Sequence, residues 1–353
     1  MSGADGAPVS SYELGGTSVP VGARSDLLLK VSESYTGDRL SIPVTVVNGV
    51  ADGPTLFVTA AIHGDELNGI AIVRELLSRV ESEVAGTLIC VPMVNVLGVQ
   101  FHSRYLPDRR DLNRCFPGSA SGSTASRMAN TLMTEVIVGA DAGIDLHTAA
   151  NRRTNAPQIR ARLDDARAAE LGRIFGAPFL IDASLRPGSL RDAADREGVP
   201  VLTYEGGQAL RFEEEVIAAG TDGILRVMGR LGMLPAHMVP SPPDIPVRVS
   251  DETHWVRAER GGILDLHVAP GDEVKTGQPL WTVVGPFGRE RNQKESPYDG
   301  VVIGLTTLPL VNPGDAVVHV AVLGRHEQVW IDEPTDEEDN AEGDGGSPGA
   351  RDG

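Results

Sequence analysis

The sequence is poor in lysine and has no long hydrophobic run. Lysine occurs only at Lys30, Lys275 and Lys294, and the formal net charge is -18. A chain this acidic would be repelled by a phosphate backbone or an anionic lipid surface, so we expect no nucleic-acid partner and no membrane partner. The sequence also lacks a run of about 18 apolar residues, which excludes a transmembrane helix by the usual length criterion.

Cysteine is almost absent as well. The two cysteines, Cys90 and Cys115, stand in no CxxC pattern and are expected to be reduced packing residues. The first eight residues have neither a basic stretch nor an apolar stretch, so no signal peptide is predicted. These features together indicate a cytoplasmic protein.

A chain of 353 residues is too long for one ordinary hydrophobic core, which predicts two domains with tails at the chain ends. We expect a flexible N-terminus over residues 1–25, an α/β catalytic domain over 26–235, a Pro-rich linker over 236–246, a β-rich domain over 247–330, and an acidic disordered tail over 331–353. In the α/β domain, strand and helix patterns alternate, which predicts a mixed sheet flanked by helices. The alternating elements are expected at residues 55–62, 70–80, 87–94, 126–138, 143–148, 164–175, 199–204 and 213–231.

The β-rich segment contains two similar halves, each with a Pro-Gly-Asp turn, at residues 270–272 and 313–315. This pattern resembles the small β-barrel of biotinyl/lipoyl carrier domains. A carrier needs a lysine at an exposed hairpin tip, but the region between the halves, residues 285–291, has arginines instead. We therefore expect the barrel without the carrier function. The histidines of this part are expected to be surface or core residues rather than ligands: His254, His267, His319 and His326.

A candidate metal site begins with His63 and Glu66. They are separated by two residues and stand after the apolar run 55–62 and before a helical pattern, so both side chains can converge on one point. Gly64 is expected to let the backbone turn sharply between them. His147 ends a second strand-like run. Two imidazoles and one carboxylate leave the fourth position of a zinc ion open to water, as a catalytic site requires.

Each of these residues also fits a plainer interpretation. The pattern His63-x-x-Glu66 is typical of a capped helical turn without metal, because an acidic side chain favours a helix N-terminus. A histidine at a strand end, such as His147, is often only hydrogen-bonded. Strand alternation places Asp145 on the same face as His147, where its carboxylate can support a metal ligand.

Residues 111–118 follow a Pro- and Arg-rich segment and are expected on a long loop. The neighbouring Asn113 and Arg114 offer an amide and a planar guanidinium, which suit a substrate carboxylate. The alternative for the nearby arginines, Arg104, Arg109 and Arg110, is a solvated basic loop.

Glu205 follows the apolar run 199–204 and precedes two glycines. The carboxyl end of a strand is where open α/β sheets place their active groups, so Glu205 is a candidate catalytic carboxylate. The alternative is a glutamate that caps a surface turn.

These motifs occur in the order His63-x-x-Glu66, Asp111-Leu112-Asn113-Arg114, His147 and Glu205. The ordered set resembles the succinylglutamate desuccinylase/aspartoacylase family, which is related to zinc carboxypeptidases. The resemblance covers about residues 40–235 and continues more weakly to about residue 323. It implies a zinc-carboxypeptidase-like α/β domain, followed by a β-domain that leans over the active site and restricts substrate size.

The resemblance also implies residue roles. One zinc per subunit would be held by His63, Glu66 and His147, and Glu205 would be the general base. Asn113 and Arg114 would bind substrate. Arg104 would polarise the scissile carbonyl, with Arg109 and Arg110 as alternatives for that role.

The function predicted from the sequence is zinc-dependent hydrolysis of the amide bond of a small N-acyl amino acid by zinc-activated water. One alternative is a metallocarboxypeptidase that acts on short peptides. Another is a non-catalytic metal-binding scaffold, which the presence of Glu205 disfavours. The sequence leaves open the acyl group, the amino acid, the pathway and the oligomeric state, with a homo-oligomer as one option.

Overall fold

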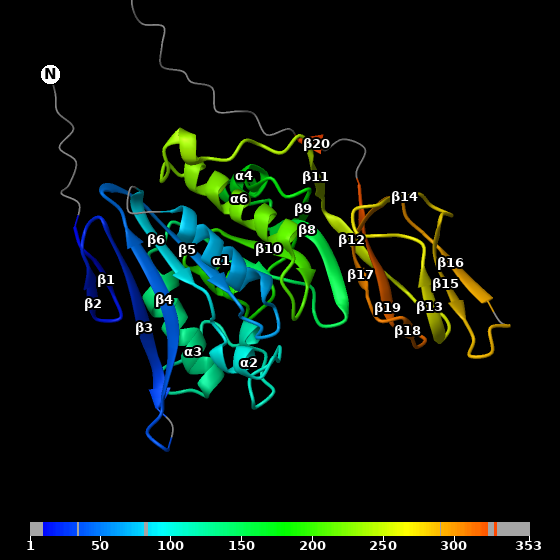
Figure 1. Ribbon diagram of the computed structural model, residues 1–353, viewed down its shortest axis with the longest axis horizontal. Helices are drawn as coiled ribbons and strands as arrows, with labels where there is room; N and C mark the ends of the chain where they lie inside the picture. The colour runs from blue at the N-terminus through cyan, green and yellow to red at the C-terminus, as the bar shows by residue number, and fades with distance from the viewer. Residues whose placement is uncertain (1–9, 34, 81–83, 290, 324–327, 330–353) are drawn as a thin grey trace, which may run out of the picture.

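The computed structural model describes residues 10–33, 35–80, 84–289, 291–323 and 328–329, and one large mixed sheet runs through these residues (Figure 1). The main path of this sheet is, in spatial order, β12 (Glu252–Arg257), β19 (Ala316–Val322), β17 (Gly300–Thr306), β8 (Arg153–Ala161), β10 (Val201–Gln208), β7 (Ala142–His147), β5 (Ala51–Ala60), β6 (Ala85–Val91), β4 (Arg39–Asn48) and β3 (Ala23–Glu33). The central strands β6, β5, β7 and β10 are parallel, and β8 and β4 flank them in antiparallel pairing.

Helices cover both faces of this central part, which confirms the predicted mixed α/β fold. One face packs against α1 (Asn68–Arg79), α4 (Ala166–Phe175) and α6 (Glu214–Arg230). The other packs against α3 (Thr124–Leu132), the π-helical turn η2 (Met133–Ile137) and α5 (Leu190–Arg196). The central strands are continuous apolar runs because both of their faces are buried. The loop between β6 and α3 carries the short α2 (Val96–Gln100) and the 3-10 turn η1 (Leu112–Arg114).

The prediction of a flexible segment over residues 1–25 is wrong from residue 10 onward. Strands β1 (Tyr12–Leu14) and β2 (Thr17–Val19) form an antiparallel hairpin, and Leu14 and Val19 are buried in the core. The glycines that suggested flexibility form the hairpin turn, since both Gly15 and Gly16 have positive φ angles. Residues 1–9 lie outside the described residues.

The boundary after the Pro-rich segment also differs from the prediction. That segment holds only the 3-10 turn η3 (Ala236–Met238), and β11 (Val247–Ser250) then pairs in parallel with β9 (Phe179–Asp182). Val247 and Val249 are buried in the core beneath α4 and α6. Strand β11 therefore completes the α/β domain, because it covers an edge strand that would otherwise be unpaired. The short β20 (Gln328–Val329) pairs with β11 as well.

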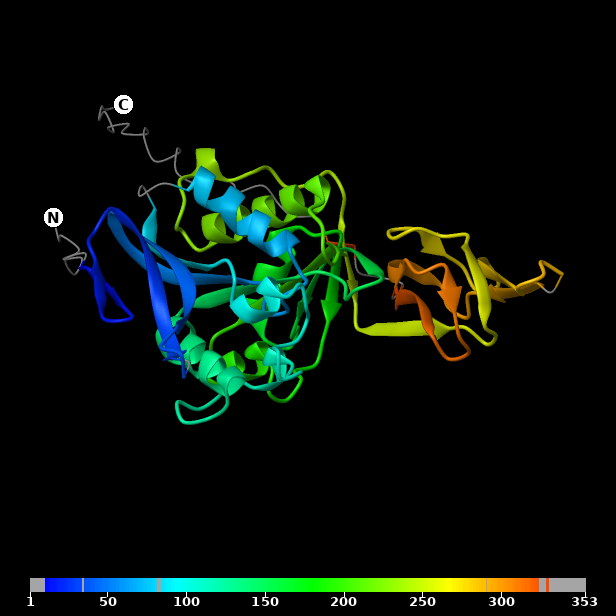
Figure 2. The same ribbon diagram turned by 60° about the horizontal axis from the view of Figure 1, so that its bottom comes forward.

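The C-terminal β-domain, from β12 onward, consists of two sheets and extends from one end of the molecule (Figure 2). Strands β12, β19, β17 and the short β14 (Glu273–Val274) belong to the large sheet. A separate four-stranded sheet contains β16 (Arg291–Glu295), β15 (Pro279–Val284), β13 (Gly262–Leu266) and β18 (Leu310–Val311). Among the described residues no strand pairing closes these sheets into the barrel that we expected.

Instead, β17 pairs with β8 and joins the β-domain directly to the catalytic sheet. The acidic tail predicted over residues 331–353 lies outside the described residues. Within the part of the chain that the structure describes, no helix has the length and apolarity needed to cross a membrane.

Candidate metal centre and substrate pocket

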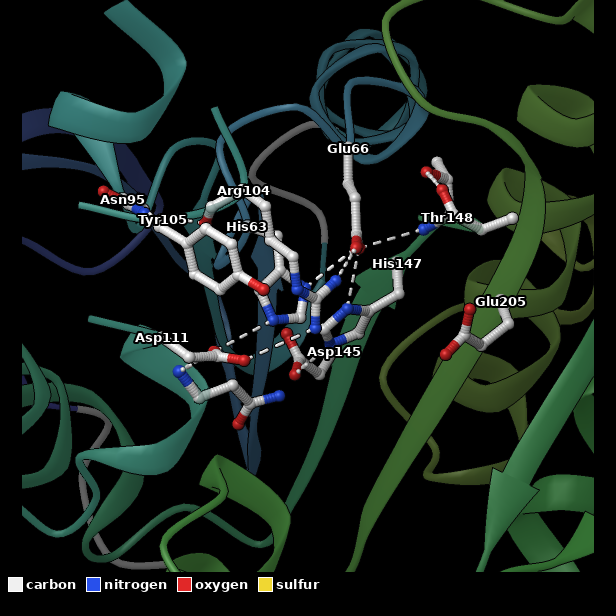
Figure 3. A network of polar contacts seen from close by, with 12 residues as sticks. His63, Glu66, Asn95, Arg104, Tyr105, Asp111, Asp145, His147, Thr148 and Glu205 are labelled. Carbon is white, nitrogen blue, oxygen red and sulfur yellow. Dashed lines mark hydrogen bonds and ion pairs between the residues drawn. The ribbon is translucent and has the colours of Figure 1, made fainter. Parts of the chain in front are cut away.

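The three predicted metal ligands meet at the carboxyl ends of two neighbouring parallel strands. His63 follows β5, Glu66 precedes α1, and His147 is the last residue of β7. These residues are 4%, 1% and 5% exposed, and their ligand atoms all lie within 4.8 Å of one another (Figure 3). The carboxyl ends of parallel strands are where α/β sheets gather functional groups, and this fold brings the three residues there.

The backbone around His63 differs in detail from the sequence prediction. The chain leaves β5 through Ala61, whose φ of 51° lies in the left-handed region and marks a strained turn. Gly64 is required by close packing against another backbone segment rather than by a sharp turn. A Cβ at Gly64 would lie 1.9 Å from the backbone carbonyl carbon of Gly98, so only glycine permits this close approach to α2.

The donor set fits a bound metal. Nδ1 of His63 and Nδ1 of His147 each lie 2.8 Å from a different oxygen of Glu66. His63 Nδ1 is buried, and its close contact with Glu66 Oε1 lacks the angles of a hydrogen bond, so among the described residues this nitrogen has no hydrogen-bond partner. The opposite ring nitrogens lie 3.2 Å from Asp111 Oδ1 and 2.8 Å from Asp145 Oδ2. A carboxylate behind each imidazole fixes the ring orientation and directs Nδ1 toward the shared centre.

The electrostatics of the cluster also favour a cation. Burial alone would raise the pKa of the Glu66 carboxyl, but His63 and His147 hold it well below its usual range. Burial would lower the pKa of His147, but Asp145 and Glu66 outweigh burial and raise that pKa. The Glu66 carboxylate therefore stays ionised and attracts positive charge to this point.

Of the three arginines considered for carbonyl polarisation, Arg104 is the one that reaches the metal cluster. Its Nη1 donates to Glu66 Oε1 at 3.0 Å, and its Nη2 lies 3.5 Å from Asp111 Oδ2 (Figure 3). Arg109 and Arg110 are exposed and do not line the cavity at the metal cluster. The geometry thus singles out Arg104 among the three.

The cavity has a volume of about 440 Å³ and contains the other predicted site residues. Glu205 of β10 lies beside His147 in the parallel pairing with β7, and its carboxylate accepts a hydrogen bond from Asn155 Nδ2 at 2.9 Å. Glu205 therefore faces the cavity from within a strand rather than capping a surface turn.

Asn113 and Arg114 lie on η1 and line the same cavity. The side-chain oxygen of Asn113 accepts a hydrogen bond from the backbone N–H of Leu190 at 2.8 Å, which leaves its amide nitrogen for a ligand. The Arg114 side chain is exposed, and its guanidinium donates to the backbone carbonyl of Asn113.

Two arginines that the sequence analysis missed also line the cavity. Arg160 Nε and Arg191 Nη1 are buried and have no hydrogen-bond partner among the described residues. Burial and the neighbouring Arg160 lower the pKa of Arg191 to about 10. Unpartnered guanidinium nitrogens at a cavity wall are suited to an anionic group of a ligand. No local motif marks these residues, since Arg160 is on β8 and Arg191 is in α5.

The C-terminal β-domain supplies another wall of the cavity. Trp255 of β12 and His319 of β19 are cross-strand partners, and their rings stack with centroids 4.5 Å apart. Arg153 lies over the Trp255 ring at 4.5 Å. Burial, together with Arg160 and Arg153, lowers the pKa of His319 to about 3. His319 is thus neither a surface nor a purely core residue, and only the pairing of β12 with β19 reveals its position at the cavity.

Comparison with known proteins agrees with this architecture. The family model of the succinylglutamate desuccinylase/aspartoacylase catalytic domain matches residues 52–231. The N-α-acetyl-L-2,4-diaminobutyric acid deacetylase of Halomonas elongata is 33% identical over 292 residues, which are 79% of this chain and 85% of that protein.

Two solved structures share the fold. A succinylglutamate desuccinylase/aspartoacylase from Rhodobacter sphaeroides is 27% identical with a TM-score of 0.76, over 86% of this chain and 96% of that one. A product-bound ectoine utilization protein from Ruegeria pomeroyi is 24% identical with a TM-score of 0.76, over 89% of this chain and 98% of that one. The motif order, the fold and these matches together show that the chain belongs to the succinylglutamate desuccinylase/aspartoacylase family.

Proposed function

We propose that this protein is a zinc-dependent deacylase that hydrolyses the amide bond of a small N-acyl amino acid. The observation that carries the proposal is the convergence of His63, Glu66 and His147 beside Glu205 in one cavity. The relative from Halomonas elongata is a deacetylase of an N-acetylated amino acid, which supports the same class of reaction.

His63, Glu66 and His147 would hold the zinc ion, with Asp111 and Asp145 supporting the two imidazoles. Bound zinc supplies a Lewis acid and lowers the pKa of a water molecule to about 7. The donor set of two imidazoles and one carboxylate is that of a catalytic rather than a structural zinc site.

The protein's own groups would carry the remaining steps. Glu205 accepts a proton from the attacking water and then delivers it to the nitrogen of the leaving amine. Arg104 stabilises negative charge on the oxygen of the scissile carbonyl as the water adds. The bond between the carbonyl carbon and the nitrogen then breaks, which releases a carboxylic acid and a free amino acid.

The cationic side of the cavity would bind the substrate carboxylate. Asn113 and Arg114 of η1 offer donors to the cavity, and Arg160 and Arg191 offer buried guanidinium nitrogens that have no partner among the described residues. We assign most of the carboxylate binding to Arg160 and Arg191, because desolvated guanidinium groups bind an anion more strongly than exposed ones.

The size of the cavity favours a small substrate over an extended peptide. A volume of about 440 Å³ is in the range of small-molecule sites, and the Trp255–His319 pair of the β-domain bounds one side. The cavity therefore supports the N-acyl amino acid hypothesis over the metallocarboxypeptidase alternative.

The test is a substrate panel on zinc-loaded protein and on protein stripped with a chelator. The panel contains N-acetyl-L-2,4-diaminobutyrate, N-acetyl, N-succinyl and N-formyl derivatives of other amino acids, and short unblocked peptides. We expect turnover of N-acyl amino acids by the zinc form, loss after chelation, and recovery on adding zinc. Faster turnover of the peptides, or full activity after chelation, would contradict the proposal.

A further inference from the structure

The alternation of side chains along strand β8 is interrupted between residues 160 and 155. Arg160 and Asn155 both line the cavity, although a regular strand alternates faces and residues five apart point to opposite sides. The pairing of β8 with β10 explains this, because the step from 158 to 155 on β8 matches the shorter step from 205 to 207 on β10. The extra residue forms a bulge that includes Pro157, which has no N–H to contribute to a ladder. The bulge therefore brings Asn155 to the cavity face.

The Asn155 side chain reaches the proposed general base. Its Nδ2 donates to Glu205 Oε2 at 2.9 Å. Among the described residues no other group donates a hydrogen bond to this carboxylate. One oxygen of Glu205 is thus held, and Oε1 is left to accept a proton. A hydrogen bond to an ionised carboxylate also fixes the plane of the group, which a general base needs in order to face its water.

The C-terminal β-domain determines how much room Asn155 has. Gly304 of β17 is the direct partner of Asn155 in the antiparallel pairing of β17 with β8. A Cβ on Gly304 would lie 2.5 Å from Asn155 Oδ1, so any other residue would displace the amide. Gln158 holds the two strands together, since its Nε2 donates to the backbone carbonyl of Ile303 at 3.0 Å.

We propose that Asn155 is a positioning residue for Glu205, and that Gly304 of the β-domain provides the space that its amide needs. The inference rests on the proposed role of Glu205 as general base. It gives the β-domain a second function beyond bounding the cavity, because the β17–β8 pairing then sets the orientation of a catalytic carboxylate in the other domain.

The first test compares Asn155→Ala, Asn155→Asp and the wild type on the N-acyl amino acid that the substrate panel turns over fastest. Asn155→Asp keeps the shape of the side chain but replaces the amide donor by a carboxylate. We expect both variants to lower kcat by about 10- to 100-fold, the usual cost of removing a partner that orients a site residue, with little change in KM. A role in packing alone predicts the reverse, namely that Asn155→Asp retains most of the activity that Asn155→Ala loses.

The second test uses double variants, which show whether Asn155 acts through Glu205. Asn155→Ala should lower kcat strongly in the wild type and by less than about threefold in a Glu205→Gln background. Equal losses in both backgrounds would overturn the inference. Gly304→Ala should lower kcat while Asn155 is present, and should add little to Asn155→Ala because the crowded side chain is then gone.

Thr154→Val is the matched control. Thr154 neighbours Asn155 on β8 but does not line the cavity, so kcat should stay within about twofold of the wild type. Zinc content and melting temperature are measured for every variant. If the melting temperature of Asn155→Ala falls sharply, the comparison rests on Asn155→Asp, which keeps the side-chain volume, and on Gly304→Ala, which leaves the Asn155 side chain in the protein.

Failure of the inference and failure of the proposed function give different results. If Glu205→Gln retained the wild-type kcat, Glu205 would not be the general base, and the proposed mechanism would be wrong. A strong loss in Glu205→Gln, with wild-type kcat in Asn155→Ala and Asn155→Asp, would overturn only the positioning role of Asn155.

Discussion

The cavity has histidines at its two ends, and their surroundings shift their pKa values in opposite directions. At the metal end, His147 lies between Asp145 and Glu66, which raise its pKa despite burial. At the far end, His319 stacks on Trp255, and burial with the nearby arginines lowers its pKa to about 3. The carboxylates around His147 therefore favour a positive charge beside that ring, either a proton or a metal ion, whereas the surroundings of His319 disfavour one.

This difference suggests how the cavity would orient the proposed substrate. The metal cluster contains buried carboxylates and an imidazole nitrogen without a hydrogen-bond partner, whereas a cationic part of the lining, Arg160 of β8 and Arg191 of α5, contains buried guanidinium nitrogens without partners among the described residues. A ligand with a polarisable carbonyl at one end and a carboxylate at the other would satisfy both sets of groups. An N-acyl amino acid has this arrangement of charge, and the following four predictions test the two ends separately.

The largest effect is expected at the metal end. His147→Ala should bind far less than one zinc per chain, and its activity should fall beyond the roughly 10⁴-fold upper range of a lost general base. Zinc is measured by atomic emission after gel filtration. His254→Ala is the control, because His254 stacks on Tyr298 outside the cavity and should leave zinc content and activity intact. Full zinc retention in His147→Ala would show that the cluster is not the metal site.

The next effect concerns the base beside the metal. Glu205→Gln is nearly isosteric and leaves the proposed ligands untouched, so zinc should remain while kcat falls by roughly 10² to 10⁴. KM should change little if substrate binding is at equilibrium. Steady-state kinetics with a zinc assay on the same samples checks this, and loss of zinc from the variant would mean that Glu205 supports the metal instead.

At the cationic end, Arg191→Gln should raise KM for a carboxylated substrate by about 10- to 100-fold, because a buried charge-assisted contact is lost. Arg114→Gln should cost less than about tenfold, since an exposed charge contributes little. Both losses should largely disappear on the carboxamide analogue. A larger cost for Arg114→Gln would place the substrate carboxylate at η1, as the sequence analysis predicted.

The smallest effect is a pH dependence of stability. Because the pKa of His319 is about 3 in the folded protein and 6.5 ordinarily, the unfolded chain takes up a proton near pH 6.5 while the folded protein does not. The group therefore destabilises the fold increasingly as pH falls below 6.5, by about 2 kcal/mol at pH 5.

His319→Phe keeps a ring against Trp255 but cannot be protonated, so its metal-free form should lose about 2 kcal/mol less than the wild type between pH 7.5 and 5.0. Urea unfolding at the two pH values measures this difference. His237→Gln, at an exposed position, is the control and should keep the wild-type dependence. Equal pH dependence in His319→Phe and the wild type would show that His319 is protonated in the folded state.

The metal end could be predicted from the sequence because its signals are local. His63 and Glu66 are three positions apart at a strand-to-helix junction, and His147 ends an apolar run. The predicted strands at 55–62 and 143–148 correspond to β5 and β7, whose parallel pairing brings the ligands together. Hydrophobic periodicity gives such elements directly, and the carboxyl ends of parallel strands necessarily meet at one edge.

The cationic end and the β-domain wall could not be predicted in this way. Arg191, Trp255 and His319 come from elements far apart in the chain, and none belongs to a motif. The N-terminal hairpin was missed for a related reason. Gly15 and Gly16 suggest a flexible segment in the sequence, and only the burial of Leu14 in the tertiary structure shows that they form the turn of a packed hairpin.

By itself, the sequence determined the candidate set of metal ligands, the mixed α/β class and the family, all of which depend on local spacing and on the order of motifs. Only the tertiary structure decided that β17 pairs with β8, that a bulge turns Asn155 toward Glu205, and that Gly304 leaves room for it. The physical reason is that strand register between segments about 150 residues apart depends on long-range packing. A slip of one residue would turn every side chain of the strand to the other face, and no local pattern records which register is formed.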